Sequence, residues 1–388
     1  MRIVLFAHPR FLASVSMPRF ADMILHGMKA RGHQIEVWEP TPRFHTLPAA
    51  PLLKKWLGYL DQYLVFPLQV RMRLRNTDER TLFVLADQAL GPWVPLVAVR
   101  PHVVHVHDFT ALRSALGELK ENPTSWTGRQ YQAMIRRGFA RGQHFISVSE
   151  NTRRDLHRFL AGSPRSSEVV YNGLNYPFRP MRRVDCVAAL ADADLSLPQG
   201  GCLLHVGGNQ WYKNRAGVLE IYEAYVRQMA APLPLWMVGA PPDEALKAAA
   251  QRLDSEGRVR FLTGLSGDQL CAAYSSARLL LFPSLAEGFG WPIAEAMACG
   301  CLVLTTDEAP MTEVGGEAAY YLPRRPDMDS GGWAQTAADR IMQILALPAE
   351  EDLERRAMGL ARSAVFDADR ALDSYERIYH RVLEEVPG

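Results

Sequence analysis

The sequence predicts two α/β domains, each built around a parallel β-sheet. The chain has 388 residues, which is more than a single hydrophobic core usually sustains. Short apolar runs alternate along it with helical patterns, an order that is typical of βαβ units. Residues 172–201 interrupt this order with prolines and glycines, as a connection between domains does. We therefore place the domain boundary near 175–198.

The apolar runs place the expected strands in two series. The first series comprises 3–7, 34–38, 82–85, 103–106, 145–148 and 168–171, with helices in the intervals. The second series comprises 202–206, 235–238, 259–262, 279–282 and 302–305. A helical pattern closes the chain from Trp333 onward. Open parallel sheets bind ligands at the carboxyl ends of their strands, so the residues that follow these runs are the candidates for function.

Composition gives no indication of a nucleic-acid-binding, disulfide-stabilised or membrane-spanning protein. Hydrophobic residues make up 48% and charged residues 22% of the chain, and a net charge of +1 gives no whole-molecule attraction to nucleic acid. The five cysteines form an odd set without metal-binding spacing, so we expect a reducing, cytoplasmic environment. The apolar run after Met1 is too short for a signal peptide, and no stretch approaches the ~20 apolar residues of a spanning helix.

The most informative segment, 283–300, reads PSLAEGFGWPIAEAMACG. It follows an apolar run, turns through glycines and enters a helix with Pro292 in the first turn and Gly300 just past the end. Such a helix start offers unpaired N–H groups to a diphosphate, and glycines let the phosphate come close. Glu287 and Glu295 are suited to accept hydrogen bonds from ligand hydroxyls, although each alone also fits an ordinary helix carboxylate.

A second strand end repeats this arrangement at 205–214. Gly207, Gly208 and Asn209 follow the strand, and Lys213 stands at the next helix start. A lysine there is suited to stabilise the charge on a departing diphosphate. Taken alone, it also fits a surface lysine of a first helical turn.

The two glutamates, eight residues apart with Gly-Phe-Gly between them, resemble the signature of the retaining GT-B glycosyltransferases of family 4. The resemblance implies two Rossmann-like domains whose parallel sheets face an interdomain cleft. Residues 1–175 would bind the acceptor, with a C-terminal helix at about 366–388 crossing back to them, and 176–365 would bind a nucleotide-sugar. It further implies hexosyl transfer with retention of anomeric configuration and no covalent enzyme intermediate. We expect neither a metal nor another cofactor.

The resemblance also assigns roles to single residues. Glu287, which we count as catalytic, would hold the donor sugar and Glu295 the ribose, while Gly288, Phe289 and Gly290 would meet sugar and phosphate through their backbone.

The resemblance extends to the other strand ends of this half. The diphosphate would meet Gly207, Gly208, Asn209 and Lys213, but Gly208 stands where the family has an arginine. Asn209 or Arg215 would have to compensate. Arg260 and Leu262 match a strand end whose backbone reads the base, although a plain buried strand explains them equally well. Gly239, which ends another strand, is a further candidate for the donor site.

In the first half, the run HVVHVHD at 102–108 delivers His107 and Asp108 to a strand end. This pair is suited to orient an acceptor hydroxyl or to take its proton, and a structural role remains equally open. His8, Arg10 and Ser16 follow the first strand, where they could contact the acceptor or fill ordinary loop roles.

Residues 51–75 combine leucines and aromatic residues with lysines and arginines. A helix that touches a membrane surface is one interpretation, and it would suit a lipid-linked rather than a free glycan acceptor at the inner face of a membrane. A core helix with a solvated basic face is the interpretation that we favour.

The sequence also allows two other interpretations. Asp192 and Asp194 have the Asp-x-Asp spacing of metal-dependent glycosyltransferases, but they fall in the connection between domains, so we do not expect them to hold a metal. A nucleotide-sugar epimerase, or a catalytically idle nucleotide-sugar-binding scaffold, would reuse the same architecture. The missing arginine favours the scaffold slightly, whereas the presence of Glu287, Glu295 and Lys213 favours a transferase.

Overall fold

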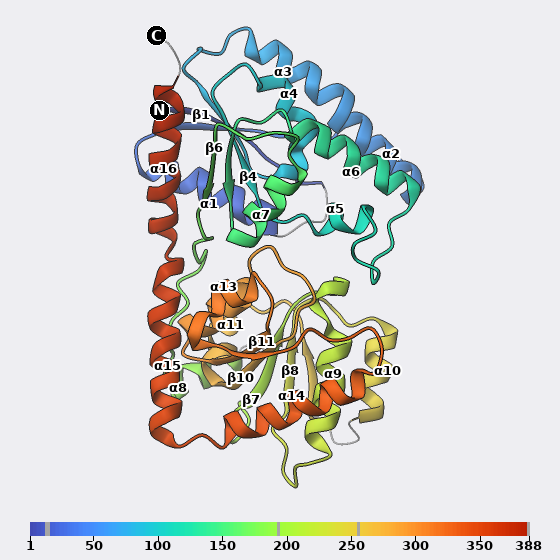
Figure 1. Ribbon diagram of the computed structural model, residues 1–388, viewed down its shortest axis with the longest axis vertical. Helices are drawn as coiled ribbons and strands as arrows, with labels where there is room; N and C mark the ends of the chain where they lie inside the picture. The colour runs from blue at the N-terminus through green and yellow to red at the C-terminus, as the bar shows by residue number, and fades with distance from the viewer. Residues whose placement is uncertain (12–15, 192–194, 254–256, 386–388) are drawn as a thin grey trace. The chain divides into compact units, whose positions relative to one another are not determined.

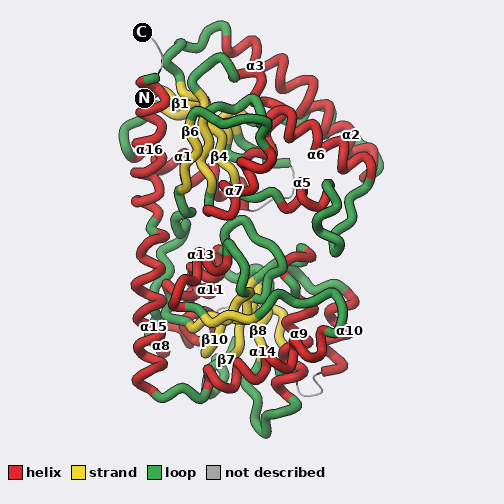
Figure 2. The backbone as a smooth tube through the Cα atoms, in the orientation of Figure 1, coloured by secondary structure: helices red, strands yellow, loops and turns green. Residues whose placement is uncertain are grey.

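The computed structural model describes residues 1–11, 16–191, 195–253 and 257–385. Its contacts divide the chain into two compact units. Unit 1 contains Met1–Asn175 and the segment that begins at Ala368, and unit 2 contains Tyr176–Asp367. In each unit, helices cover a parallel sheet (Figures 1 and 2). The predicted α/β class and the two parallel sheets are confirmed.

Unit 1 contains a six-stranded parallel sheet in the order β2-β1-β3-β4-β5-β6. Its elements are β1 (Arg2–Phe6), α1 (Ser16–Ala30), β2 (Gln34–Trp38), α2 (Pro51–Leu60), the π turn η1 (Asp61–Val65), α3 (Phe66–Leu74), β3 (Leu82–Leu85), η2 (Gln88–Trp93), α4 (Val94–Val97), β4 (His102–Val106), α5 (Thr110–Ala115), α6 (Trp126–Phe139), β5 (His144–Ser147), α7 (Glu150–Phe159), β6 (Ser166–Val169) and α16 (Ala368–Glu384).

Unit 2 contains a second six-stranded parallel sheet in the order β12-β11-β10-β7-β8-β9. Its elements are α8 (Arg183–Ala191), β7 (Cys202–Val206), η3 (Trp211–Lys213), α9 (Arg215–Val226), β8 (Leu235–Val238), α10 (Glu244–Leu253), β9 (Val259–Leu262), α11 (Gly267–Ser276), β10 (Ala277–Phe282), α12 (Trp291–Ala298), β11 (Leu302–Thr306), α13 (Met311–Gly315), η4 (Gly316–Ala318), β12 (Tyr320–Leu322), α14 (Ser330–Leu345), α15 (Ala349–Ser363) and η5 (Ala364–Phe366).

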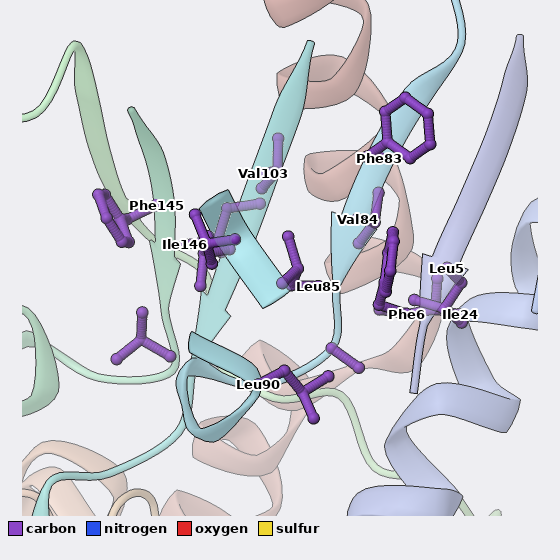
Figure 3. Packing of buried hydrophobic residues seen from close by; sticks show 14 of the residues in the cluster. Leu5, Phe6, Ile24, Phe83, Val84, Leu85, Leu90, Val103, Phe145 and Ile146 are labelled. Carbon is purple, nitrogen blue, oxygen red and sulfur yellow. The ribbon is translucent and has the colours of Figure 1, made fainter. Parts of the chain in front are cut away.

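The core of unit 1 lies between its strands and the flanking helices. Figure 3 shows side chains of neighbouring strands, among them Phe6, Val84 and Val103, side by side in this layer. Helix α16 joins the same core because its buried residues recur every three or four positions, including Leu372, Tyr375 and Tyr379. The hydroxyl of Tyr379 lies 2.7 Å from His105 Nε2, so the last described helix is fixed to β4.

The structure differs from the sequence-based expectation at several elements, among them β6, β12 and α8. Strand β6 begins two residues before the predicted 168–171. The sequence analysis missed β12, a strand of only three residues, and α8, which lies within the predicted connection. Helix α8 buries Cys186 and Leu190 and packs beside α11, and two buried positions are too few to produce a clear periodicity. No helix among the described residues is both long and apolar enough to span a bilayer.

Candidate active site

Each sheet has one place where the order of its strands reverses. In unit 2 the chain passes from β7 to β8 and β9 on one side, and then crosses to β10 on the other side of β7. In unit 1 the strand order reverses between β1 and β3. Doubly wound sheets bind ligands outside the carboxyl ends of their strands at this reversal point. Ligand-binding residues are therefore expected in the loops after β7 and β10, and in those after β1 and β3.

In unit 2, the loops after β7 and β10 bring a cation and a carboxylate together. Lys213 Nζ lies 2.7 Å from Glu287 Oε1, and only 15% and 8% of the two side chains are exposed. The side-chain amide of Asn214 donates a hydrogen bond of 2.9 Å to the carbonyl oxygen of Pro283, which ties the same two loops together. A largely buried ion pair thus lies beyond two neighbouring strands at the reversal point.

Helix α12 begins directly after this loop. Its N-cap is Gly290 with φ of 104°, a conformation that glycine adopts without strain. Pro292, the second residue of α12, has no N–H, and Ile293 donates its N–H to the carbonyl oxygen of Gly290 at 3.0 Å. What this helix start offers an anion is therefore mainly the positive end of the helix dipole. Glu295, in the second turn, is buried, and its carboxylate accepts a hydrogen bond of 2.8 Å from the hydroxyl of Tyr274. Tyr274 therefore fixes the carboxylate predicted to meet the ribose.

The rest of the Glu287 loop is held by packing. Phe289 is buried, and its ring lies 5.4 Å from the ring of Phe366 in an edge-to-face arrangement. Gly288 separates Phe289 from Glu287. The side chain of Phe289 thus serves as an anchor, so the predicted contacts of Phe289 with a donor would involve its backbone.

Glycines bring the ends of β7, β8 and β9 close together. Gly207 N–H donates to the carbonyl oxygen of Val238 at 2.9 Å, and Gly239 N–H donates to that of Leu262 at 2.9 Å. A Cβ atom on Gly239 would lie 2.1 Å from the carbonyl oxygen of Gly207, and the φ of Gly239 is +147°. Three predicted donor residues therefore occupy adjacent strand ends, while the side chain of Arg260 is exposed on β9.

Arg215 connects the loops after β7 and β8. Its guanidinium donates to the Asn209 side chain and, at 2.9 Å, to the carbonyl oxygen of Ala240. The side chain is buried, which lowers the pKa of Arg215. Asn209 and Arg215 line a pocket of about 260 Å³ together with Asp243. Next to Asn209, Gly208 carries no side chain. Arg215, whose guanidinium contacts Asn209, is a candidate to replace the arginine that the sequence lacks there.

In unit 1, a histidine and an aspartate meet at the reversal point. His8 follows β1 and Asp87 follows β3, and His8 Nε2 lies 2.8 Å from Asp87 Oδ2. Burial acts to raise the pKa of Asp87, but the hydrogen bond and charge of His8 outweigh it and keep that pKa below its usual value. Because an ionised carboxylate only accepts hydrogen bonds, His8 Nε2 carries the proton. Nδ1 of His8 can accept a hydrogen bond from a ligand only when it carries no proton of its own.

His107 and Asp108 lie on the next strand end, after β4, and are engaged by the protein itself. His107 Nε2 lies 2.9 Å from the carbonyl oxygen of Ala86, and burial lowers the pKa of His107. Asp108 accepts a hydrogen bond of 2.8 Å from the backbone N–H of Thr110, at the start of α5. Burial raises the pKa of Asp108 despite this hydrogen bond.

The other predicted acceptor residues have different surroundings. Arg10 is exposed and forms ion pairs with Asp22 at 3.1 Å and Glu39 at 3.5 Å. Ser16 begins α1, and its side chain lies outside the described part of the structure. Asp192 and Asp194 also lie outside the described residues.

Sequence reasoning missed Asp87 and Tyr274. Asp87 comes two residues after a buried strand, the same signal that selected His107 and Asp108, so the strand-end rule could have found it. Tyr274 lies on α11, twenty-one residues before Glu295, and no local pattern connects the two positions.

One group of potential metal ligands is present among the described residues. Single ligand atoms of His33, Glu376 and His380 lie within 4.8 Å of one another. His33 precedes β2, at the opposite end of the sheet from His8 and Asp87. Its ring already contacts the amino terminus at 3.1 Å and Glu376 at 2.6 Å. This cluster is therefore separate from the candidate active site.

Comparisons with known proteins identify the family of the chain. The family described as "Glycosyl transferases group 1" matches residues 197–357, and the family described as "Glycosyltransferase Family 4" matches residues 17–176. O-antigen chain mannosyltransferase B of Escherichia coli is 31% identical over 57% of this chain and 56% of its own length. GDP-mannose:cellobiosyl-diphosphopolyprenol alpha-mannosyltransferase of Xanthomonas campestris is 31% identical over 65% of this chain and 62% of its own length. The chain thus spans somewhat more than half of these two relatives.

Solved structures share the fold. HepE of Anabaena, determined in complex with UDP and glucose, has a TM-score of 0.70 at 17% identity and covers 100% of both chains. Sucrose-phosphate synthase of Thermosynechococcus elongatus has a TM-score of 0.68 at 17% identity and also covers 100% of both chains. At these identities the likeness concerns the fold alone, which is the two-sheet GT-B architecture.

Proposed function

Because the chain belongs to glycosyltransferase family 4, we propose that it transfers a mannosyl residue from GDP-mannose to a glycan or lipid-linked acceptor in polysaccharide biosynthesis. The E. coli and Xanthomonas relatives are both named as mannosyltransferases, and the name of the second specifies GDP-mannose. The observation that carries the proposal is the Lys213–Glu287 ion pair, 2.7 Å long, at the reversal point of unit 2 and beside the start of α12.

The donor chemistry follows from these groups. A nucleotide-sugar bound here would place its diphosphate near the positive end of the α12 dipole and against Lys213, which would stabilise the negative charge on the departing GDP. Glu287 would accept hydrogen bonds from mannose hydroxyls, and Glu295, held by Tyr274, would accept them from the ribose. We propose that the transfer retains the anomeric configuration, as the resemblance of the motif at 287–295 implies. We further propose that it needs no metal, because Lys213 and the positive end of the α12 dipole would stabilise the negative charge of the diphosphate.

On the acceptor side, we propose His8 as the group that orients the attacking hydroxyl. Asp87 holds the ring by a hydrogen bond of 2.8 Å and leaves Nδ1 of neutral His8 to accept from the acceptor's O–H. His107 is a weaker candidate because it is buried, whereas His8 is partly exposed. His107 and Asp108 would then shape the pocket around His8.

We also propose that the protein works in a reducing compartment, the cytoplasm. All five cysteines are buried free thiols. Cys271 Sγ and Cys299 Sγ lie 3.6 Å apart without a bond between them, as is usual where thiols are kept reduced.

The proposal is tested with purified protein, radiolabelled GDP-mannose, polyprenyl-diphosphate-linked saccharides as acceptors, and EDTA in the buffer. We expect mannosylated product with the α configuration of the donor, read by NMR. Lys213→Met should lower kcat/KM about 100-fold, whereas Lys247→Met, which removes an exposed lysine of α10, should leave it unchanged.

Other outcomes would reassign the protein. Conversion of the donor to an epimer without transfer would identify an epimerase. Saturable binding of GDP-mannose without turnover of any acceptor would favour the scaffold. Activity that EDTA abolishes and Mg²⁺ restores would contradict metal independence.

A further inference from the structure

Helices α2 and α3 form one continuous helical segment through the π turn η1 (Figure 1). Its solvent side carries a line of large apolar side chains, each between 41% and 60% exposed. We call this line the ridge, and it consists of Leu53, Trp56, Leu60, Leu64, Leu68 and Met72. Isolated exposed leucines are ordinary, but a continuous row is unusual on a monomeric protein and marks an interaction surface.

The π turn keeps the ridge on one side of the helix. From Trp56 onward its members recur every fourth residue, a spacing that drifts around a regular α-helix of 3.6 residues per turn. In η1 the N–H of Phe66 reaches back five residues to the carbonyl oxygen of Asp61, which widens the turn and reduces the drift. Pro67 provides a cause, since it has no N–H to donate to the fourth residue before it.

The opposite side of the segment is anchored in unit 1. Phe66 and Val70 belong to the core, and Gln62 is buried. The indole N–H of Trp93 donates to the carbonyl oxygen of Gln62 at 3.0 Å. The ridge is therefore the outer face of a firmly attached helix. The core-helix interpretation of residues 51–75 therefore fits the inner face of this segment, but it does not account for the ridge.

All exposed charges along this segment are positive. Lys54 and Lys55 lie near one end, and Arg71, Arg73 and Arg75 lie near the other. The segment contains one acidic residue, Asp61, which is 1% exposed. Its carboxylate accepts backbone hydrogen bonds of 2.9 to 3.0 Å from residues 43–45 and so presents no charge at the surface.

Helix α6 lies alongside and extends this surface. The ring of Tyr131 stacks on Tyr59 with 5.7 Å between centroids, and its hydroxyl lies 2.8 Å from that of Tyr63. Trp126, at the start of α6, is 72% exposed. Residues 124–142 include arginines and no acidic residue.

We propose that the ridge and its flanking cations dock unit 1 onto an anionic lipid bilayer. The apolar side chains would enter the boundary between headgroups and acyl chains, and the lysines and arginines at both ends would meet lipid phosphates. A second copy of the chain is a poorer occupant, because apposing two such faces would bring like charges together. The inference goes beyond the proposed transfer and is independent of it, since bilayer binding needs neither donor nor acceptor.

The test is co-sedimentation of the full-length protein with vesicles of phosphatidylcholine, with and without about one-third phosphatidylglycerol. We expect binding to the anionic vesicles that weakens with salt. The ridge variant Leu60→Gln/Leu64→Gln/Leu68→Gln should bind at least 10-fold more weakly. The charge variant Lys54→Gln/Arg71→Gln/Arg75→Gln should lose the preference for anionic vesicles.

The matched control replaces three apolar side chains of unit 2 that are 46% to 67% exposed, as Val184→Gln/Val187→Gln/Leu353→Gln. It should bind like the unchanged protein. Equal loss in the control, or no binding of the unchanged protein to anionic vesicles, would overturn the proposal. The proposal would also be overturned if light scattering showed that the unchanged protein is a dimer, that the ridge variant is a monomer, and that neither binds vesicles. If the ridge substitutions destabilise the fold, the charge variant provides the test, because its three substituted side chains are exposed and their replacement should not affect folding.

Discussion

Lys213 and Glu287 illustrate how two residues 74 positions apart form one functional group. The structure joins them at 2.7 Å, and each neutralises the charge of the other in a largely buried place. A diphosphate entering this place would compete with the carboxylate for the lysine. The two residues should therefore affect nucleotide binding in opposite directions.

We predict that Lys213→Met weakens GDP binding at least 10-fold, because the diphosphate loses its cation. Glu287→Gln should leave GDP binding unchanged or tighter, since it frees Lys213 and removes a repelling charge, while it lowers kcat about 100-fold by removing a contact to the sugar. Calorimetric titration with GDP and the transfer assay measure the two effects. Equal weakening of GDP binding by both substitutions would contradict these roles.

His205 supplies a second prediction at this scale. It is buried on β7, and burial lowers the pKa of His205 to about 3 despite the contact of its Nδ1 with the carbonyl oxygen of Leu281. The unfolded chain, with a pKa near 6.5, takes up the proton first, so stability present above pH 6.5 is lost as the pH falls towards 3. Between pH 6.5 and 5.0 the loss from this one group should be about 2 kcal/mol.

Urea unfolding at the two pH values measures this loss. His205→Gln, which keeps a side-chain donor, should lose about 2 kcal/mol less than the unchanged protein over the same interval. His380→Gln, at an exposed position, serves as the control and should change the pH dependence little. The account of His205 is wrong if both variants retain the same pH dependence as the unchanged protein.

At the scale of elements, the candidate site lies at the strand ends. These ends pack so closely that one added methyl group should lower the stability of the fold. Gly239→Ala would place a Cβ 2.1 Å from the carbonyl oxygen of Gly207, in addition to the strain of a positive φ. We expect a loss of more than about 3 kcal/mol in the free energy of unfolding. Gly264→Ala also has a positive φ but meets nothing within 4 Å, so it should cost only about 1–2 kcal/mol. Thermal or urea unfolding of both variants compares them, and equal costs would contradict the packing argument.

The elements also show which parts of the fold a sequence predicts well. Strands such as β3 and β10 are runs of buried apolar residues, and their position follows from composition alone. Helix α8 is stabilised by contacts with α11, which is distant in sequence, and β12 is an edge strand of three residues beside β11, so local patterns gave no sign of either element. The π turn η1 was likewise hidden, since it depends on one proline within a helix that looks regular.

The candidate site was predictable where its residues follow strands or belong to a motif. Glu287, Glu295 and Lys213 were found in this way, and Asp87 would have been found had every strand end been read. The partners Tyr274 of Glu295 and His8 of Asp87 depend on which helices and strands become neighbours, which is a property of the sheet order and not of the local sequence.

At the scale of the whole molecule, two units repeat one arrangement for two different purposes. Each has a six-stranded parallel sheet with titratable side chains paired at the reversal of strand order, Lys213 with Glu287 in unit 2 and His8 with Asp87 in unit 1. In the proposed function, Lys213 of unit 2 attracts the diphosphate and His8 of unit 1 orients the acceptor hydroxyl. This division is what a transferase with separate donor and acceptor sites requires.

The most direct test of the central claim is the thermal stability of the full-length protein with saturating GDP-mannose, compared with UDP-, ADP- and TDP-sugars, in the presence of EDTA. A ligand at about 100 times its Kd adds about 2.7 kcal/mol, which corresponds to a rise in Tm of roughly 5–11 °C for a unit of this size. We predict such a rise in Tm with GDP-mannose that Glu295→Ala abolishes. No rise with any nucleotide-sugar, or a rise that survives Glu295→Ala, would contradict the assignment of the donor site.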